Sequence, residues 1–158
     1  MIRISKLADY AVVMLTSMAQ ERGVVLSAAA LSERTRISEP TVAKILKILG
    51  QDGLVASQRG AHGGYKLARA PERIPISAVI EALDGPIALT TCVDGALLDC
   101  SLAQTCGVRG RWDEVNITIR NALEEITLAD MMRGKTCCGP LQSNHQVQEE
   151  TEDHYGRH

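Results

Sequence analysis

Apolar residues recur at helical spacing along the first twenty positions of the chain. One stripe of this segment is apolar and consists of Leu7, Ala11, Met14, Leu15 and Met18. Ser5 precedes the stripe in the position of a helix N-cap. The opposite face carries two valines beside Asp9, a carboxylate in apolar surroundings. The pattern predicts a helix from Ser5 to Gln20 that makes contacts on both of its sides.

Two shorter helical patterns follow and are joined by a tight turn at Arg36 and Ile37. The first begins at Ser27, and the second runs from Ser38 to Gly53. The second pattern places its apolar residues at core spacing, namely at Val42, Ile45, Leu46 and Leu49. Its opposite face is small, basic and polar, with Ala43, Lys44, Lys47 and Gln51. Two short helices with such an outer face are typical of a helix-turn-helix whose second helix enters the major groove of DNA.

A β-hairpin is predicted directly after this helix pair. Residues 54–59 alternate as a strand, residues 60–64 form a glycine-rich tip, and residues 65–68 return. Each piece alone has a plainer interpretation, either a surface helix with two solvated lysines or an ordinary hairpin turn. Together they predict a DNA-binding winged helix in residues 1–70. The candidate DNA-contacting residues are Ser38, Thr41, Ala43, Lys44, Lys47, Arg59 and His62.

The second half of the chain is predicted to be helical as well. A linker with a short helix occupies residues 71–90, and residues 108–134 hold a long helix followed by a short one capped by Thr127. Apolar residues of the long helix step by three and four, at Trp112, Val115, Ile119, Ala122 and Ile126. This spacing favours packing along the same helix of a second copy, although the helix could instead lie on its own domain. The polar tail, 135–158, is predicted to be disordered, and the fold class is mainly α with a small β-hairpin.

Charge is divided unevenly along the 158 residues. Residues 1–70 hold ten lysines and arginines against five aspartates and glutamates, whereas the remainder holds seven against fourteen. A basic front half favours a polyanionic partner such as double-stranded DNA. The chain has no apolar run of 18 residues and no signal-peptide pattern, so we expect a cytoplasmic protein without a membrane partner. We find no nucleophile–base pattern or phosphate-binding loop, and expect neither enzymatic activity nor a small-molecule substrate.

Three of the five cysteines fall in residues 91–107, at Cys92, Cys100 and Cys106. Thiolates are soft ligands that select zinc, copper(I) or iron–sulfur clusters. Structural zinc commonly uses closer pairs, whereas gaps of seven and five residues suit a loop that wraps a cluster. A zinc site, a thiol switch and plain reduced thiols remain open at this point. The adjacent Cys137 and Cys138 cannot easily offer both sulfurs to one site and are left out of it.

The combined motifs resemble the IscR/NsrR family of winged-helix regulators, also called the Rrf family, over residues 1–134. The stretches that carry the resemblance are RISKLADYAV, LSERTRISEPTVAKILKIL, LVASQRGAHGGYKLA, the three-cysteine segment and the long helix through ITLADM. Within the family the sequence is most similar to regulators of the SUF iron–sulfur assembly operon. The resemblance implies a homodimeric transcription regulator, in many members a repressor, that carries a 2Fe–2S or 4Fe–4S cluster.

The fourth ligand of such a cluster departs from one family pattern and matches another. IscR-type members use a histidine three residues after the last cysteine, and this chain has Arg109 there, which stays protonated and cannot ligate. In NsrR-type members the resemblance implies an aspartate of the other subunit, and the matching residue is Asp9. Water or a small thiol are alternatives, and Asp9 also suits the first turns of any helix. The alternative functions are therefore an NsrR-like nitric-oxide-sensing repressor and a zinc or thiol-switch regulator.

Overall fold

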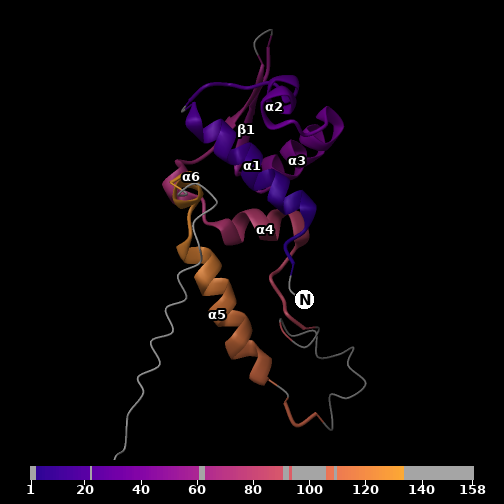
Figure 1. The fold of residues 1–158 in the computed structure, drawn as a ribbon, viewed down its shortest axis with the longest axis vertical. Helices are drawn as coiled ribbons and strands as arrows, with labels where there is room; N and C mark the ends of the chain where they lie inside the picture. Colours follow the sequence, from indigo (N-terminus) through magenta and orange to yellow (C-terminus); the bar gives the residue numbers. More distant parts are fainter. Residues whose placement is uncertain are drawn as a thin grey trace, which may run out of the picture.

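A cluster of helices with a hairpin forms the body of the molecule, from which one helix extends (Figure 1). The computed structural model describes residues 3–21, 23–60, 63–90, 93, 106–108 and 110–133. In the described part of the chain, none of the helices is long and apolar enough to cross a membrane. The fold is mainly helical with one two-stranded antiparallel sheet.

Helices α1 (Lys6–Gln20), α2 (Ala28–Thr35) and α3 (Glu39–Gln51) enclose the core of the body. Their core-facing side chains are fully buried, among them Met14 and Leu15 of α1, Leu31 of α2, and Leu46 and Leu49 of α3. Ser5 caps α1 by accepting from the backbone N–H of Ala8, and Ser27 caps α2 by accepting from that of Ala30. The predicted helix-turn-helix is therefore present. The apolar residues at helical spacing lie on one face of each helix, and that face is buried in the core.

The hairpin consists of β1 (Val55–Gln58) and β2 (Gly64–Leu67), paired antiparallel with Val55 opposite Leu67. It is fastened to the helices by a bridge between Leu26 and Tyr65, whose backbones exchange hydrogen bonds of 2.9 and 2.8 Å. Gly64 permits this close approach, because a Cβ atom there would lie 2.5 Å from the carbonyl oxygen of Leu26. The glycines that predicted a turn thus also allow the wing to dock.

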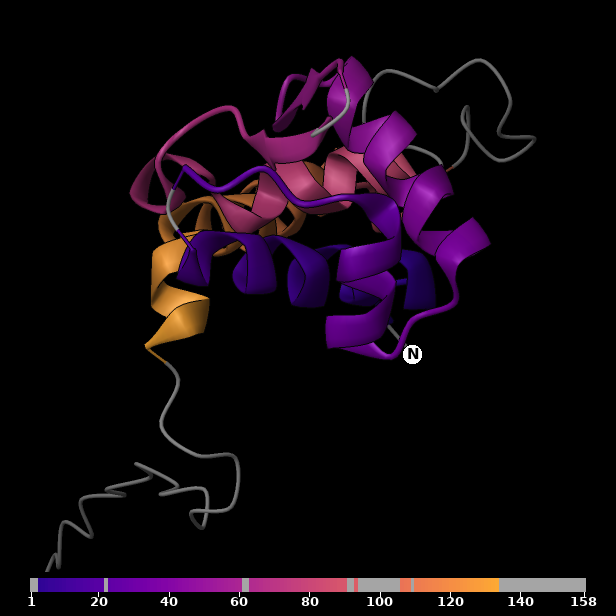
Figure 2. The same cartoon turned by 90° about the horizontal axis from the view of Figure 1, so that it is seen from above.

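The chain then passes through a short 3-10 helix, η1 (Pro71–Arg73), into α4 (Ile76–Asp84), which packs against α1 and α3. Figure 2, the view from above, shows α4 beside α1. Helix α5 (Arg111–Glu125) extends away from the body, and α6 (Leu128–Met132) returns to pack on α1. The return is fastened by two backbone hydrogen bonds, Ile76 N to Ile126 O and Leu128 N to Ile74 O, both 2.8 Å.

Helix α6 starts with a capping box. The Thr127 hydroxyl accepts from the backbone N–H of Asp130, and the Asp130 carboxylate accepts from the Thr127 backbone N–H at 3.0 Å and hydroxyl at 2.6 Å. These hydrogen bonds, the side-chain one foremost, lower the pKa of Asp130 below its ordinary value. The cap of α6 predicted from Thr127 is confirmed, and it forms directly at the junction between α5 and the body.

Candidate DNA interface and cysteine segment

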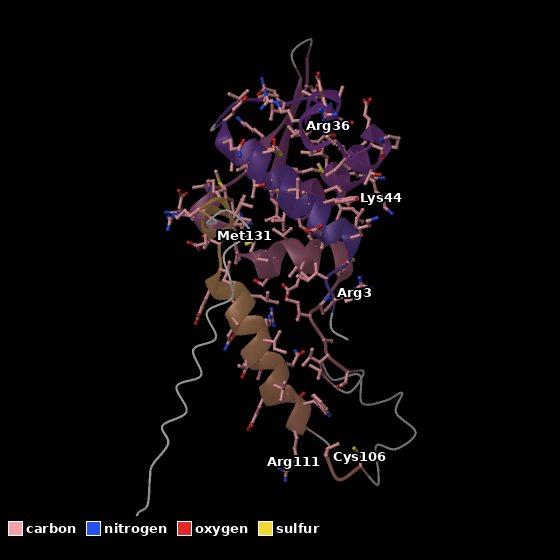
Figure 3. All side chains as sticks on the ribbon, viewed as in Figure 1. Arg3, Arg36, Lys44, Cys106, Arg111 and Met131 are labelled. Atoms are coloured by element: carbon pink, nitrogen blue, oxygen red, sulfur yellow. The ribbon has the colours of Figure 1, made fainter. Side chains whose placement is uncertain are left out.

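The outer face of α3 is basic and exposed, as its pattern predicts. Ala43, Lys44 and Lys47 are all exposed, whereas Val42, Ile45, Leu46 and Leu49 are fully buried on the opposite face. Lys44 projects outward from α3, away from the other helices of the body (Figure 3). A helix held by one apolar face and free on its basic face can lie in a DNA groove without losing its core contacts.

Ser38 and Thr41 are joined to one another at the start of α3. Their hydroxyl oxygens lie 2.8 Å apart, and Ser38 makes no side-chain capping hydrogen bond. Ser38 nevertheless occupies the N-cap position of α3. The backbone N–H groups of Thr41 and Val42 bond to the Ser38 carbonyl instead. Both hydroxyls remain near the helix end that a recognition helix presents to DNA.

A hollow of about 380 Å³ is lined by residues of α3 and of the hairpin. Lys47 and Gln51 line it from α3, and Ser57 and Tyr65 line it from the two strands. Ser57 had no distinguishing signal in the sequence, because a serine on a strand is ordinarily a surface residue. Arg59 is exposed just beyond the end of β1. His62 lies outside the described residues.

Cys106 and Asp9 belong to opposite parts of the molecule. Cys106 is a half-buried free thiol near the start of α5, at the end farthest from the body (Figure 3). Asp9 is exposed on α1, which lies within the body. Cys92, Cys100, Arg109, Cys137 and Cys138 lie outside the described residues. Among the residues that the structure does describe, no three His, Cys, Asp or Glu side chains gather as a metal site.

Helix α5 leaves most of its apolar residues uncovered. Trp112 is 42% and Val115 is 43% exposed, and Ile117 and Ile126 are also exposed. Ile119 and Leu123 instead line a cavity against residues 84–89 of the same chain. The predicted stripe therefore splits, with one part facing the chain itself and the other facing outward. The buried residue of α5 is Asn116, which nothing in the sequence pattern singled out.

A groove of about 780 Å³ lies between α1, α4 and α6. Its floor is apolar, formed by Ile4, Val12, Ile76, Ile80 and Met131. Arg3, Lys6 and Asp9 stand among its lining residues. The outer apolar face predicted for α1 is thus one wall of this groove, with Val12 half-buried and Asp9 exposed beside it.

Solved structures of bacterial regulators share this arrangement. CymR, the global cysteine regulator of B. subtilis, superposes with a TM-score of 0.66 at 28% identity, covering 84% of this chain and 98% of that one. IscR of T. potens gives a TM-score of 0.61 at 32% identity, covering 84% and 87%. The winged-helix fold is therefore confirmed.

Sequence comparison gives the same grouping. The regulator NsrR of Bacillus subtilis is 28% identical over 134 residues, which are 84% of this chain and 92% of that protein. Residues 4–134 match the Rrf2 family, described as an iron-dependent transcriptional regulator. These proteins are transcription regulators rather than enzymes, which implies that DNA is a partner. The predicted relationship is confirmed, and the chain belongs to the Rrf2 family of transcriptional regulators.

Proposed function

We propose that the protein is a homodimeric repressor that binds operator DNA and senses iron–sulfur cluster status or redox stress through its cysteine segment. The observation that carries the proposal is the separation of Cys106 from α1 within one chain (Figure 3). A site that uses both Cys106 and Asp9 must take them from two chains. The cluster site then lies between the two chains of a dimer, and the DNA-binding helices sit on the bodies that this site connects.

The exposed face of α5 in one copy is complementary to the groove on the body of a second copy. Trp112 and Val115 supply the apolar anchors, and Asp113 and Glu114 between them are acidic. The groove offers an apolar floor with Arg3 and Lys6 among its lining residues. Large aromatic anchors in apolar pockets with opposite charges alongside are typical of specific interfaces. With the first turns of α5 in a partner's groove, Cys106 would approach the Asp9 that lines that groove.

The donor set fits an iron–sulfur cluster. Cys92, Cys100 and Cys106 supply three soft thiolates, and Asp9 of the partner supplies a carboxylate for the remaining position. Cys106 is half-buried and free, so it is available as a ligand. A bound cluster supplies an iron centre that responds to oxidants, nitric oxide or iron supply. The role of the protein is to hold the cysteine segment against the partner's α1, which sets the spacing of the two recognition helices. The cluster can shift the equilibrium between two arrangements of the dimer only to the extent that it binds them with different affinities.

Operator contacts are assigned to the candidate residues of α3 and the hairpin. Lys44, Lys47 and Arg59 would contact phosphates, with His62 at the wing tip. Ser38, Thr41 and Ala43 would lie near base edges, where the small Ala43 suits a thymine methyl group. We propose that the operator controls SUF iron–sulfur assembly genes. DNA captured from genomic fragments by the purified protein tests this assignment, and recovery of unrelated promoters would overturn it.

The first experiment is metal analysis of protein purified without oxygen, together with its visible spectrum. We expect iron and sulfide in equal amounts and a brown chromophore that is lost in Cys92→Ala, Cys100→Ala and Cys106→Ala while the dimer persists. If the protein contains zinc, or no metal after reconstitution, the cluster proposal is wrong and the cysteine segment is a zinc site or a thiol switch. The proposed DNA binding by the winged helix would be unaffected.

A second function, nitric-oxide sensing, is favoured by the exposed Asp9 on the groove and by Arg109 in place of a ligating histidine. Asp9→Ala tests the fourth ligand that both functions share, and release from DNA by nitric oxide separates the two functions. Under the NsrR-like reading the variant loses the chromophore or changes its spectrum, and nitric oxide releases the wild-type protein from DNA. An unchanged spectrum removes Asp9 from the ligand set.

A further inference from the structure

Asn116 is buried on a helix that is otherwise largely exposed. Only 5% of its surface is accessible, and both ends of its side-chain amide are used. Nδ2 donates to the carbonyl oxygen of Ile87 at 2.8 Å, and the backbone N–H of Leu89 donates to Oδ1 at 3.0 Å. The amide therefore binds the backbone of residues 87–89 much as a neighbouring strand would, and its two partners fix its orientation.

The segment that Asn116 holds leads into the cysteines. Leu89 is three residues before Cys92, and Cys106 is four residues before Gly110, the N-cap of α5. Both ends of the cysteine segment are thus attached to the same helix, one by the chain itself and one by Asn116. The attachment points are roughly 9 Å apart along the helix axis at 1.5 Å per residue. This spacing limits the positions that the three thiols can reach.

The same segment also contacts the start of α1. The carboxylate of Asp84 accepts from the backbone N–H of Ser5 at 3.2 Å, and Ser5 is the N-cap of α1. Ile4 lines a cavity of about 260 Å³ together with residues 84–89 and with Ile119 and Leu123 of α5. Residues 84–89, which we name the strap, therefore connect α5 to the helix that carries Asp9.

We propose that Asn116 is a positioning residue for the cysteine segment, and that through the strap it links the loading of that segment to α1. The inference rests on the proposed cluster function and names a residue outside the ligand set. Groups that orient ligands from outside commonly change metal retention by about 10- to 100-fold when they are replaced. Without the Asn116 amide, the start of the cysteine segment is free to move, and cluster binding must order it.

Two variants of the full-length protein test this role. Asn116→Leu removes both hydrogen bonds and leaves the Ile87 carbonyl and the Leu89 N–H without their partner. Asn116→Asp has nearly the same shape, keeps an acceptor for Leu89 and loses the donor to Ile87. Asn121→Asp is the matched control, because it makes the same chemical and charge change at an exposed position of α5. Circular dichroism and gel filtration establish that each variant is a folded dimer.

We expect both Asn116 variants to lose iron to a chelator at least about tenfold faster than wild type, with a shifted visible spectrum. The difference in DNA affinity between loaded and metal-free protein should shrink, while metal-free DNA binding stays within about twofold. In metal-free protein, hydrogen exchange at the Leu89 amide should rise in Asn116→Leu only. Asn121→Asp should match wild type throughout.

The outcomes separate this inference from the proposed function. If wild-type protein binds no cluster, the cluster function fails and the positioning role fails with it. If wild type binds a cluster and Asn116→Asp retains it with the same spectrum and rate, the cluster function stands and the positioning role of Asn116 is overturned. Unchanged exchange at Leu89 in Asn116→Leu would likewise overturn it.

Discussion

The winged-helix body and α5 differ in what covers their apolar side chains. In the body, Leu15, Leu46 and Leu49 are fully buried by residues of the same chain. On α5, Trp112 and Val115 remain more than 40% exposed, although the helix is as regular as α1. The core of the first region is covered within one chain, whereas the second has an apolar surface that one chain does not cover. The proposed DNA reading and the proposed signal sensing thus fall in regions whose apolar surfaces are covered differently.

Truncating a core residue should produce the largest effect and should act through the body alone. Leu46→Ala is expected to lower the free energy of unfolding by about 2–5 kcal/mol, because the deleted atoms leave a cavity among fully buried neighbours. Denaturant titration measures this loss. Val24→Ala, an exposed aliphatic site on the same body, should change the value by less than about 1 kcal/mol. Equal losses in the two variants would contradict a core located on α3.

Truncating the exposed aromatic residue of α5 should have the opposite signature. Trp112→Ala is expected to weaken dimerisation by roughly 30-fold, the effect of losing about 2 kcal/mol at an interface anchor. The body should melt as before, because Trp112 is not part of its core. Analytical ultracentrifugation measures the association. Ile117→Ala is the control, since Ile117 is apolar and exposed but lies off the predicted stripe. A dimer unaffected by Trp112→Ala would assign the contact to another surface.

Substitutions at the junction between the two regions, at the start of α6, should have a smaller effect on stability. Thr127→Ala removes the capping box of α6 and is expected to destabilise the protein by about 1 kcal/mol. The lowered pKa of Asp130 means that its carboxylate favours the folded state when it is ionised. That contribution is present above the ordinary aspartate pKa of about 4 and is lost as pH falls through the lower folded-state value. Stability measured from pH 5 to pH 2 should therefore fall less steeply in Asp130→Asn.

Removing one recognition lysine should have the smallest effect on stability and a defined effect on DNA. Lys47→Ala is expected to leave unfolding within about 0.5 kcal/mol of wild type, because Lys47 is exposed. The slope of log affinity against log salt should become shallower by about one unit, across all DNA sequences. Fluorescence anisotropy at several salt concentrations measures the slope. Lys66→Ala, on the hairpin, is a charge-matched comparison, and an unchanged slope for Lys47→Ala would remove it from the phosphate contacts.

Local patterns made the body predictable from the sequence. Helical spacing located the core of α3 at Val42, Ile45, Leu46 and Leu49, and the polar residues Ser27 and Thr127 marked helix starts that the structure confirms. The observed ends of the strands differ from the predicted ones by one residue. These features depend on residues within a few positions of one another, so they can be predicted from the sequence.

Contacts between distant segments were not predictable in the same way. Asn116 sits in an amphipathic helix and has the pattern of a surface residue, yet it bonds to Ile87 and Leu89, 29 and 27 positions away. The Leu26–Tyr65 bridge likewise has no local signal. The assignment of Cys92, Cys100, Cys106 and Asp9 as ligands and of 91–107 as their segment stays a prediction, as do the other proposed domain limits and the DNA-contacting residues.

Pro75 and Thr127 pair through their backbones and so hold together the two ends of the segment between them. Residues 76–126 therefore form an insert with a closed base, of which α4 packs on the body and α5 extends away from it. Lengthening or replacing an insert of this kind costs little in chain entropy, since its ends are already held together. A change in the length of this insert beyond α4 should therefore leave the winged-helix body folded.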